Sequence, residues 1–191
     1  MSVLIPDRYA GVCKDPFDYR RVIYHECGHA VATLALGEEV IRIFIGREWE
    51  CEDPGGTQRR REWRWDIDCL INRAGEVAER CFLDGATNPD HWAKDRDLIE
   101  LVLDSDEGKT IDGFQPTREW KVIYQTELSR RAEELLRRPE VTTAVHALAE
   151  HLLKMRANLE ASAQYGQAVP RIELSGEEVK KVVMPALKSM S

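Results

Sequence analysis

Apolar residues recur at helical spacing in the segment that follows Pro16, and the repeat ends before Gly37. Asp15 is a suitable N-cap for this segment, Pro16 fits the first position of a helix, and Gly37 offers a C-terminal stop. The pattern therefore predicts a helix from about residue 16 to residue 36. Its apolar positions are Phe17, Val22, Ile23, Ala30, Val31 and Leu34.

The spacing of apolar residues changes from helical to alternating in the next segment. Residues 40–45 read Val-Ile-Arg-Ile-Phe-Ile and are rich in β-branched side chains, with Gly37 and Gly46 on either side. Alternation and β-branching of this kind predict a strand. The glycine-rich polar segment from Pro54 to Thr57 is interpreted as a loop.

Helical periodicity returns after this loop and dominates the rest of the chain. Residues 164–174 are interpreted as a glycine- and proline-containing loop, and Ser175 with Glu178 resembles a capping box that opens a final helix. The sequence therefore predicts a mainly α fold with a small β element, in one domain over residues 1–191 with an irregular segment at residues 1–14. The predicted helices run from about Trp65 to Phe82, from Asp95 or Asp97 to about Asp104, from Thr117 to Arg137 and from Val141 to Leu159.

Composition narrows the class of protein. Of the 191 residues, 43% are hydrophobic and 32% are charged, and no apolar run approaches the roughly 18 residues that cross a bilayer. The N-terminus has no basic start followed by an apolar stretch, so we expect a cytoplasmic protein that does not contact a membrane. A net charge of −7 argues against nucleic-acid binding. The basic run from Arg59 to Trp65 is interpreted as the solvated start of a helix.

Two further patterns exclude other chemistry. The five cysteines are odd in number and include no C-x-x-C pair, which predicts reduced thiols without a ligand role. Gly108-Lys109-Thr110 is similar to the end of a phosphate-binding loop, but Leu103 stands where that motif needs a glycine. We therefore expect no ATP binding by this chain.

The most informative motif is His25-Glu26-Cys27-Gly28-His29, an H-E-x-x-H pattern inside the first predicted helix. On a helix, residues four apart lie about 40° apart around the axis and roughly 6 Å apart along it. The imidazoles of His25 and His29 could therefore bind one metal ion. Glu26 lies about 100° round from His25, where it could reach a metal-bound water. This arrangement predicts a catalytic zinc site.

A catalytic zinc usually takes three protein ligands. No histidine occurs from Ala30 to Asp90, which excludes the compact motif with a third histidine soon after the second. The remaining candidates for the third ligand are Glu76, Glu79, His91, Asp95 and Asp97. Position in the sequence does not choose between them.

The segment Tyr24 to Ala30 resembles the H-E-x-G-H-A motif in the peptidase domain of FtsH-type membrane-anchored AAA+ zinc proteases. Three later stretches resemble that family in the same order, so the resemblance covers most of the chain. These stretches are residues 40–47 with Gly56-Thr57, residues 73–79, and residues 147–150 with residues 173–179.

The resemblance implies roles for individual residues. The third zinc ligand of that family is an aspartate followed by Leu or Ile at the start of a helix. Asp97 fits that pattern best and Asp95 is the alternative, because the residues just upstream depart from it. Glu79 would orient a ligand, and Val40 to Ile45 matches the edge strand along which the substrate lies extended.

The function implied is that of a zinc metallopeptidase, with zinc held by His25, His29 and Asp97 and with Glu26 as the general base. The sequence carries no Walker motif, so we expect cleavage of flexible or unfolded polypeptides. This hypothesis also allows two kinds of partner: a separate unfoldase, or further copies of this chain in a homo-oligomer. The alternatives are a non-catalytic module that binds peptides or proteins, and a regulatory protease for one partner. Glu26 favours an enzyme, because a structural zinc needs no general base.

Overall fold

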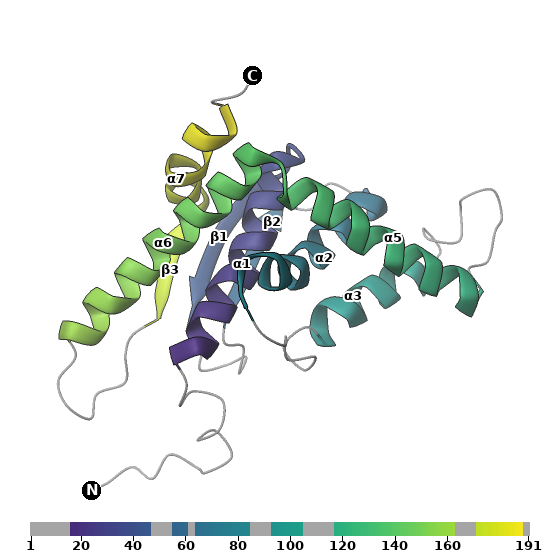
Figure 1. Cartoon of the computed structure of the whole chain (residues 1–191), viewed down its shortest axis with the longest axis horizontal. Helices are drawn as coiled ribbons and strands as arrows, with labels where there is room; N and C mark the ends of the chain where they lie inside the picture. Colours follow the sequence, from purple (N-terminus) through teal and green to yellow (C-terminus); the bar gives the residue numbers. More distant parts are fainter. Residues whose placement is uncertain are drawn as a thin grey trace, which may run out of the picture.

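Helices make up most of the computed structural model, which describes residues 16–46, 55–60, 64–84, 93–104, 117–162 and 171–188 (Figure 1). The prediction of a mainly α fold with a small β element is confirmed. The helices are α1 (Pro16–Ala35), α2 (Trp65–Phe82), α3 (Ala93–Asp104), α5 (Arg118–Leu136), α6 (Pro139–Ser162) and α7 (Gly176–Lys188). The strands are β1 (Glu39–Ile45), β2 (Gly55–Arg60) and β3 (Ile172–Ser175).

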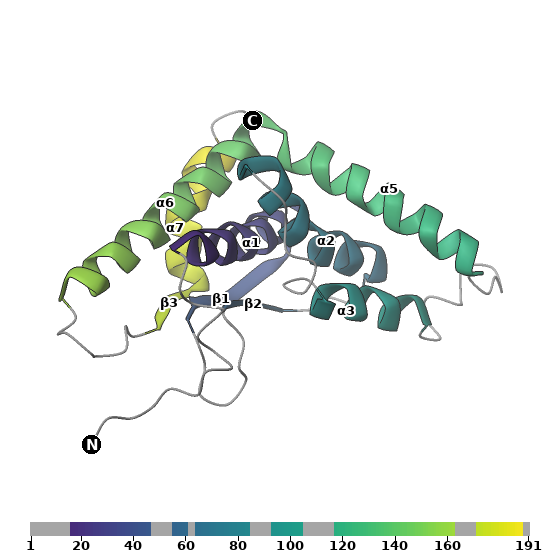
Figure 2. The same ribbon diagram turned by 60° about the horizontal axis from the view of Figure 1, so that its bottom comes forward.

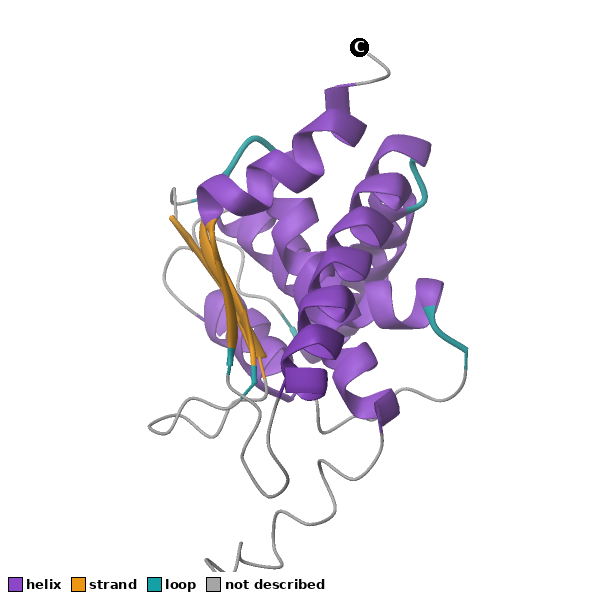
Figure 3. Ribbon diagram, turned by 90° about the vertical axis from the view of Figure 1, so that its left-hand side faces the viewer, coloured by secondary structure: helices purple, strands orange, loops and turns teal. Residues whose placement is uncertain are grey.

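Helix α1 occupies the centre of the fold. It packs against α2 and α6 and also against strands β1 and β2. The strands form an antiparallel sheet in the order β2-β1-β3, and the helices lie to one side of it (Figure 3). Helix α5 packs on α2, and its N-terminal half extends away from the sheet (Figure 2).

The apolar side chains whose spacing predicts α1 form part of the core of the molecule. Ile23, Ala30 and Val31 of α1 are fully buried, as are Ile43 and Ile45 of β1. Burial of such side chains is the main favourable term in folding, about 25 cal/mol for each Å² of apolar surface removed from water. The helix that carries the H-E-x-x-H motif is therefore held from several sides.

Helices α1 and α2 approach each other closely at Gly28. A β-carbon at this position would lie 2.6 Å from the Ala74 carbonyl oxygen and 2.6 Å from the Ala78 β-carbon. Because that space is taken by α2, only glycine allows the two backbones to come so near. Helix packing thus determines the residue at the second x position of the H-E-x-x-H motif, which is Gly28.

Two predicted loops contain strands. Strand β2 includes Gly55, Gly56 and Thr57, which lack any apolar alternation, and pairing with β1 alone makes this segment a strand. Strand β3 includes Ile172 to Leu174, within the segment interpreted as a loop, and it pairs with the other edge of β1. Strand β2 has no alternating pattern, and β3 has only four residues and a partner far away in the sequence, so local pattern gave little signal for either strand.

The paired position of β1 corrects a further expectation. Val40 to Ile45 lies in the middle of the sheet, between β2 and β3, so it is not an edge strand.

The basic run beginning at Arg59 also differs from its interpretation as a helix start. Arg59 lies on β2 and forms a buried ion pair with Asp68 of α2, while Arg60 pairs with Glu39. Residues 61–63 lie outside the described residues.

Several helix boundaries agree with the sequence. Helix α2 has the predicted bounds, and the Thr117 side chain accepts a hydrogen bond from the Trp120 amide at the start of α5. The predicted capping box is present. The Ser175 amide donates to Glu178 Oε2 at 2.8 Å, and the Glu178 amide lies 3.4 Å from Ser175 Oγ. These two residues fix the start of α7.

Some predictions fall on segments outside the described residues. These are the N-cap Asp15, the irregular segment 1–14, the thiols Cys13 and Cys51, and Gly108-Lys109-Thr110. Within the described ranges, none of the helices combines the length and apolar character needed to span a membrane.

We expect Ser175→Ala to lower the free energy of unfolding by about 1 kcal/mol, because the first turn of α7 loses its side-chain cap. Chemical denaturation monitored by circular dichroism measures this change. Ser162→Ala is the matched control, since its hydroxyl bonds only the Leu159 carbonyl at the end of α6. Equal effects of the two substitutions would contradict the role of the cap.

Candidate metal centre

The two histidines of α1 lie side by side and are almost fully buried. Their Nε2 atoms are 2.9 Å apart, and the ring centroids are 4.6 Å apart with the planes nearly perpendicular. His25 is 8% exposed and His29 is 7% exposed. The i, i+4 spacing thus places both imidazoles on the same face, as predicted from helical geometry.

Helix α3 supplies the third group, and it is Asp95. Its Oδ2 lies 2.8 Å from His25 Nε2 and 3.1 Å from His29 Nε2. His25, His29 and Asp95 form the group within the described residues whose donor atoms lie close enough to hold one metal ion.

The structure therefore brings Asp95, the alternative candidate, beside the two histidines, and not Asp97. Asp97 is exposed at the surface of α3 and is not in the group. Two residues on a helix are about 200° apart, so when Asp95 faces the histidines, Asp97 faces the opposite way. Sequence pattern did not separate the two residues, because both lie in the first turns of the same helix.

Contacts at the far side of each imidazole fix its orientation. His25 Nδ1 is 2.8 Å from Glu79 Oε1, and His29 Nδ1 is 2.8 Å from the Ile71 carbonyl oxygen. A carbonyl and an ionised carboxylate only accept hydrogen bonds, so both Nδ1 atoms carry hydrogen and donate. Glu79 is 1% exposed and makes the orienting contact that the resemblance implies. Each Nε2 faces the other two members of the group.

Three electron-rich atoms therefore face one another, and they need a positive charge between them. Burial alone lowers the pKa of His25, but hydrogen bonds to Asp95 and Glu79 and the charge of Glu26 raise it to about 10. Burial opposes ionisation of Asp95, yet the two histidines hold the pKa of its carboxyl far below the ordinary value. Both shifts show that positive charge on His25 and negative charge on Asp95 stabilise each other.

The donor set fits a zinc ion. Tetrahedral zinc with bonds of about 2.0 Å separates its ligand atoms by about 3.3 Å. The observed separations of 2.8 to 3.1 Å need to open by only a few tenths of an ångström. Two imidazole nitrogens and one carboxylate oxygen are also ligands that zinc accepts.

Gly75 of α2 keeps the space beside these donors open. A β-carbon at this position would lie 2.4 Å from His29 Nε2 and 2.7 Å from His25 Nε2. Any side chain here would press on both donor atoms. The close passage of α2 therefore shapes the site and requires glycine.

Glu26 lies beside the group but does not belong to it. Its side chain is 7% exposed, and Oε2 is 2.9 Å from the Thr57 hydroxyl of β2. Burial raises the pKa of Glu26 above the ordinary value for a glutamate, while the positive charges of the histidines oppose the rise. Thr57 is a contact that sequence reasoning missed, because β2 was interpreted as a loop.

The other candidates take no part in the group. Glu76 of α2 forms ion pairs with Arg73 and Arg80, and His91 lies outside the described residues. Cys27 and Cys69 are buried and unbridged, and burial raises the pKa of both thiols, that of Cys69 to about 12. Burial thus keeps both thiols in their neutral form.

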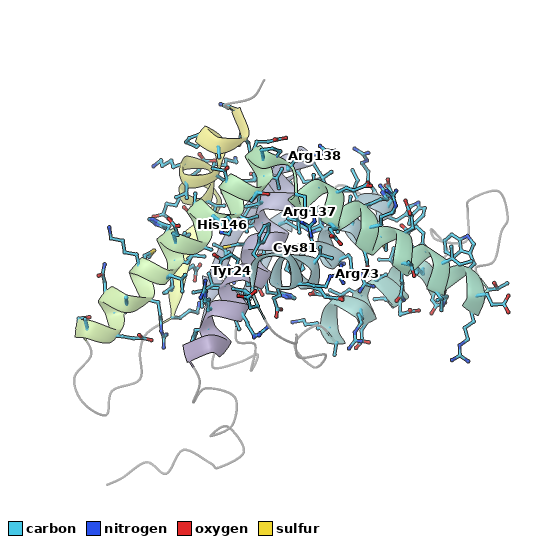
Figure 4. The ribbon with its side chains drawn as sticks, in the orientation of Figure 1. Tyr24, Arg73, Cys81, Arg137, Arg138 and His146 are labelled. Atoms are coloured by element: carbon cyan, nitrogen blue, oxygen red, sulfur yellow. The ribbon has the colours of Figure 1, made fainter. Side chains whose placement is uncertain are left out.

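Polar contacts hold the elements that carry the donors. The hydroxyl of Tyr24, the residue before His25, is 3.1 Å from Nδ1 of His146 on α6 (Figure 4). The Phe82 ring also packs against His146. On the other side, Lys121 of α5 pairs with Glu100 of α3. The first contact fixes α1 against α6, and the second fixes the helix that supplies Asp95.

No family model matches the chain, and no curated protein matches it.

We expect Asp95→Asn to weaken zinc binding by roughly a hundredfold or more, because a charged ligand becomes a neutral amide. Asp97→Asn, two residues away on the exposed face, should leave the affinity unchanged. Competition with a fluorescent zinc chelator measures both dissociation constants. The reverse order of effects would return the third position to Asp97.

Gly75→Ala should also weaken zinc binding, because the added methyl group lies within contact distance of both Nε2 atoms. A loss of about tenfold to a hundredfold is expected, comparable to disturbing a residue that orients a metal ligand. Val183→Ala is the control, since it alters a buried contact of α7 and tests whether general destabilisation lowers affinity. An unchanged zinc affinity in Gly75→Ala would show that the donors do not need this space.

Proposed function

We propose that the protein is a zinc-dependent metallopeptidase. The observation that carries the proposal is the convergence of His25, His29 and Asp95, with Glu26 next to this group but outside it. When bound, zinc supplies the Lewis acidity that makes water a nucleophile near neutral pH. A site with only a structural purpose would more often be closed by a fourth side chain.

Glu26 is the residue that moves protons in this proposal. Its carboxylate takes a proton from the attacking water and later delivers it to the leaving amine. Burial brings the pKa of Glu26 upward from its ordinary value, which favours both steps at neutral pH. Glu79 and the Ile71 carbonyl keep the two imidazoles oriented while this happens.

The substrate that suits this site is a flexible or unfolded polypeptide. Strand β2 is an edge of the sheet and touches Glu26 through Thr57. An extended peptide can add to such an edge by main-chain hydrogen bonds, which a folded segment cannot form. The proposal thus transfers the docking role from Val40–Ile45 to β2.

The resemblance to the peptidase domain of FtsH-type proteases supports the same chemistry. Its motif covers Tyr24 to Ala30, and its helix glutamate corresponds to Glu79, which contacts His25. Membership of that family remains a prediction, as does a separate unfoldase or an assembly of copies. A regulatory protease for one partner would use the same residues.

The decisive experiment compares the wild type with Glu26→Gln. Zinc content is measured by mass spectrometry, and cleavage is measured on casein and on a peptide library. We expect equal zinc content and a fall in cleavage of about a hundredfold to ten-thousandfold, the range for a general base. Glu150→Gln, an exposed carboxylate on α6, is the matched control and should retain activity.

A wild type that binds zinc but cleaves no more than Glu26→Gln on any substrate would contradict the proposal. That outcome would favour the non-catalytic binding module instead.

A further inference from the structure

The hydroxyl of Thr57 lies between two acceptors of a single residue. Its Oγ1 is 3.0 Å from the backbone oxygen of Glu26 and 2.9 Å from Oε2 of the same residue. A threonine hydroxyl has one hydrogen, so it donates to one of these acceptors at a time. A small movement of Thr57 is therefore enough to give the Glu26 carboxylate a hydrogen bond or to remove it.

The strand that carries Thr57 packs directly on the helical turn that carries Glu26. A β-carbon on Gly55 would lie 3.0 Å from Glu26 Cγ and 2.7 Å from Val22 Cγ1. Strand β2 thus meets α1 at two points, the backbone of Gly55 and the hydroxyl of Thr57. Because interiors are close-packed, a shift of β2 is passed on to Glu26.

The same strand is the edge at which an extended peptide would dock. Strand β2 pairs with β1 on one side, where Thr57 is opposite Ile43, and no described strand pairs with its other side. Backbone pairing with a peptide would fix β2 from that open side. Docking of substrate and orientation of the base therefore depend on one six-residue strand.

We propose that Thr57 is a positioning residue that couples peptide docking on β2 to the orientation of Glu26. When a peptide fixes β2, the Thr57 hydroxyl donates to the Glu26 carboxylate and holds it toward the reacting water. Without a peptide, the hydroxyl is shared with the Glu26 backbone oxygen. The inference rests on the proposed peptidase function and concerns the regulation of the same site.

The test compares Thr57→Val with Thr57→Ser in the zinc-loaded full chain. Valine keeps the β-branched shape that suits a strand but has no donor, whereas serine keeps the donor. We expect kcat to fall about tenfold to a hundredfold in Thr57→Val, the size of a lost hydrogen bond to a charged group, with KM within about twofold. Thr57→Ser should recover most of the activity.

A second measurement does not depend on activity. The carboxyl carbon of Glu26 is observed by ¹³C NMR in metal-free protein labelled at glutamate, and Glu26→Gln assigns its signal. Addition of a peptide that the wild type cleaves should shift this signal in the wild type and in Thr57→Ser, but not in Thr57→Val. Thr126→Val, which loses a hydroxyl bond to the Val122 carbonyl on α5, should behave as the wild type in both measurements.

The outcomes separate the two proposals. If the wild type binds zinc but cleaves no peptide, the proposed function fails and the coupling fails with it. If the wild type is active but its Glu26 signal does not respond to peptide, the coupling alone is overturned, whether or not Thr57→Val folds. Wild-type kinetics in Thr57→Val would overturn it equally.

Discussion

Three electron-rich atoms, two imidazole nitrogens and one carboxylate oxygen, are held within about hydrogen-bond distance of each other in a buried place. Such an arrangement favours a positive charge among them, either a proton on an imidazole or a metal ion, because burial weakens the screening of their repulsion. The contacts around His25 and His29 make it persistent. Glu79 and the Ile71 carbonyl hold the far nitrogen of each ring, so neither imidazole can rotate to relieve the repulsion. The geometry of this candidate metal centre is thus a consequence of how the surrounding helices are fixed.

Glycines at the α1–α2 contact explain how these helices come close enough. Gly28 lets the backbones of α1 and α2 approach, and Gly75 leaves space beside the donor nitrogens. The two positions belong to different helices, and at both of them a β-carbon would collide with the facing helix or with its side chains. The same close contact between α1 and α2 therefore packs the core and shapes the site.

The sheet contributes to the site through its edge. Strand β1 lies between β2 and β3 and contributes to the core, whereas β2 reaches Glu26 and is paired on one side only among the described strands. Two successive glycines of β2, Gly55 and Gly56, pack closely against α1 and the Phe44 ring. This places a main-chain edge, which suits an extended peptide, next to the carboxylate proposed to move protons.

The sequence by itself determined the features that depend on local periodicity. Helical spacing placed His25 and His29 on one face, set the bounds of α2 and located the capping box of α7, because each of these involves residues within a few turns of each other. Strands β2 and β3 were missed, since pairing with β1 creates them and their own patterns are weak. Tertiary structure alone decided the third donor. Asp95 and Asp97 begin the same helix, 66 and 68 positions after His29, and only the rotation of α3 as it packs on α2 turns Asp95 toward the histidines.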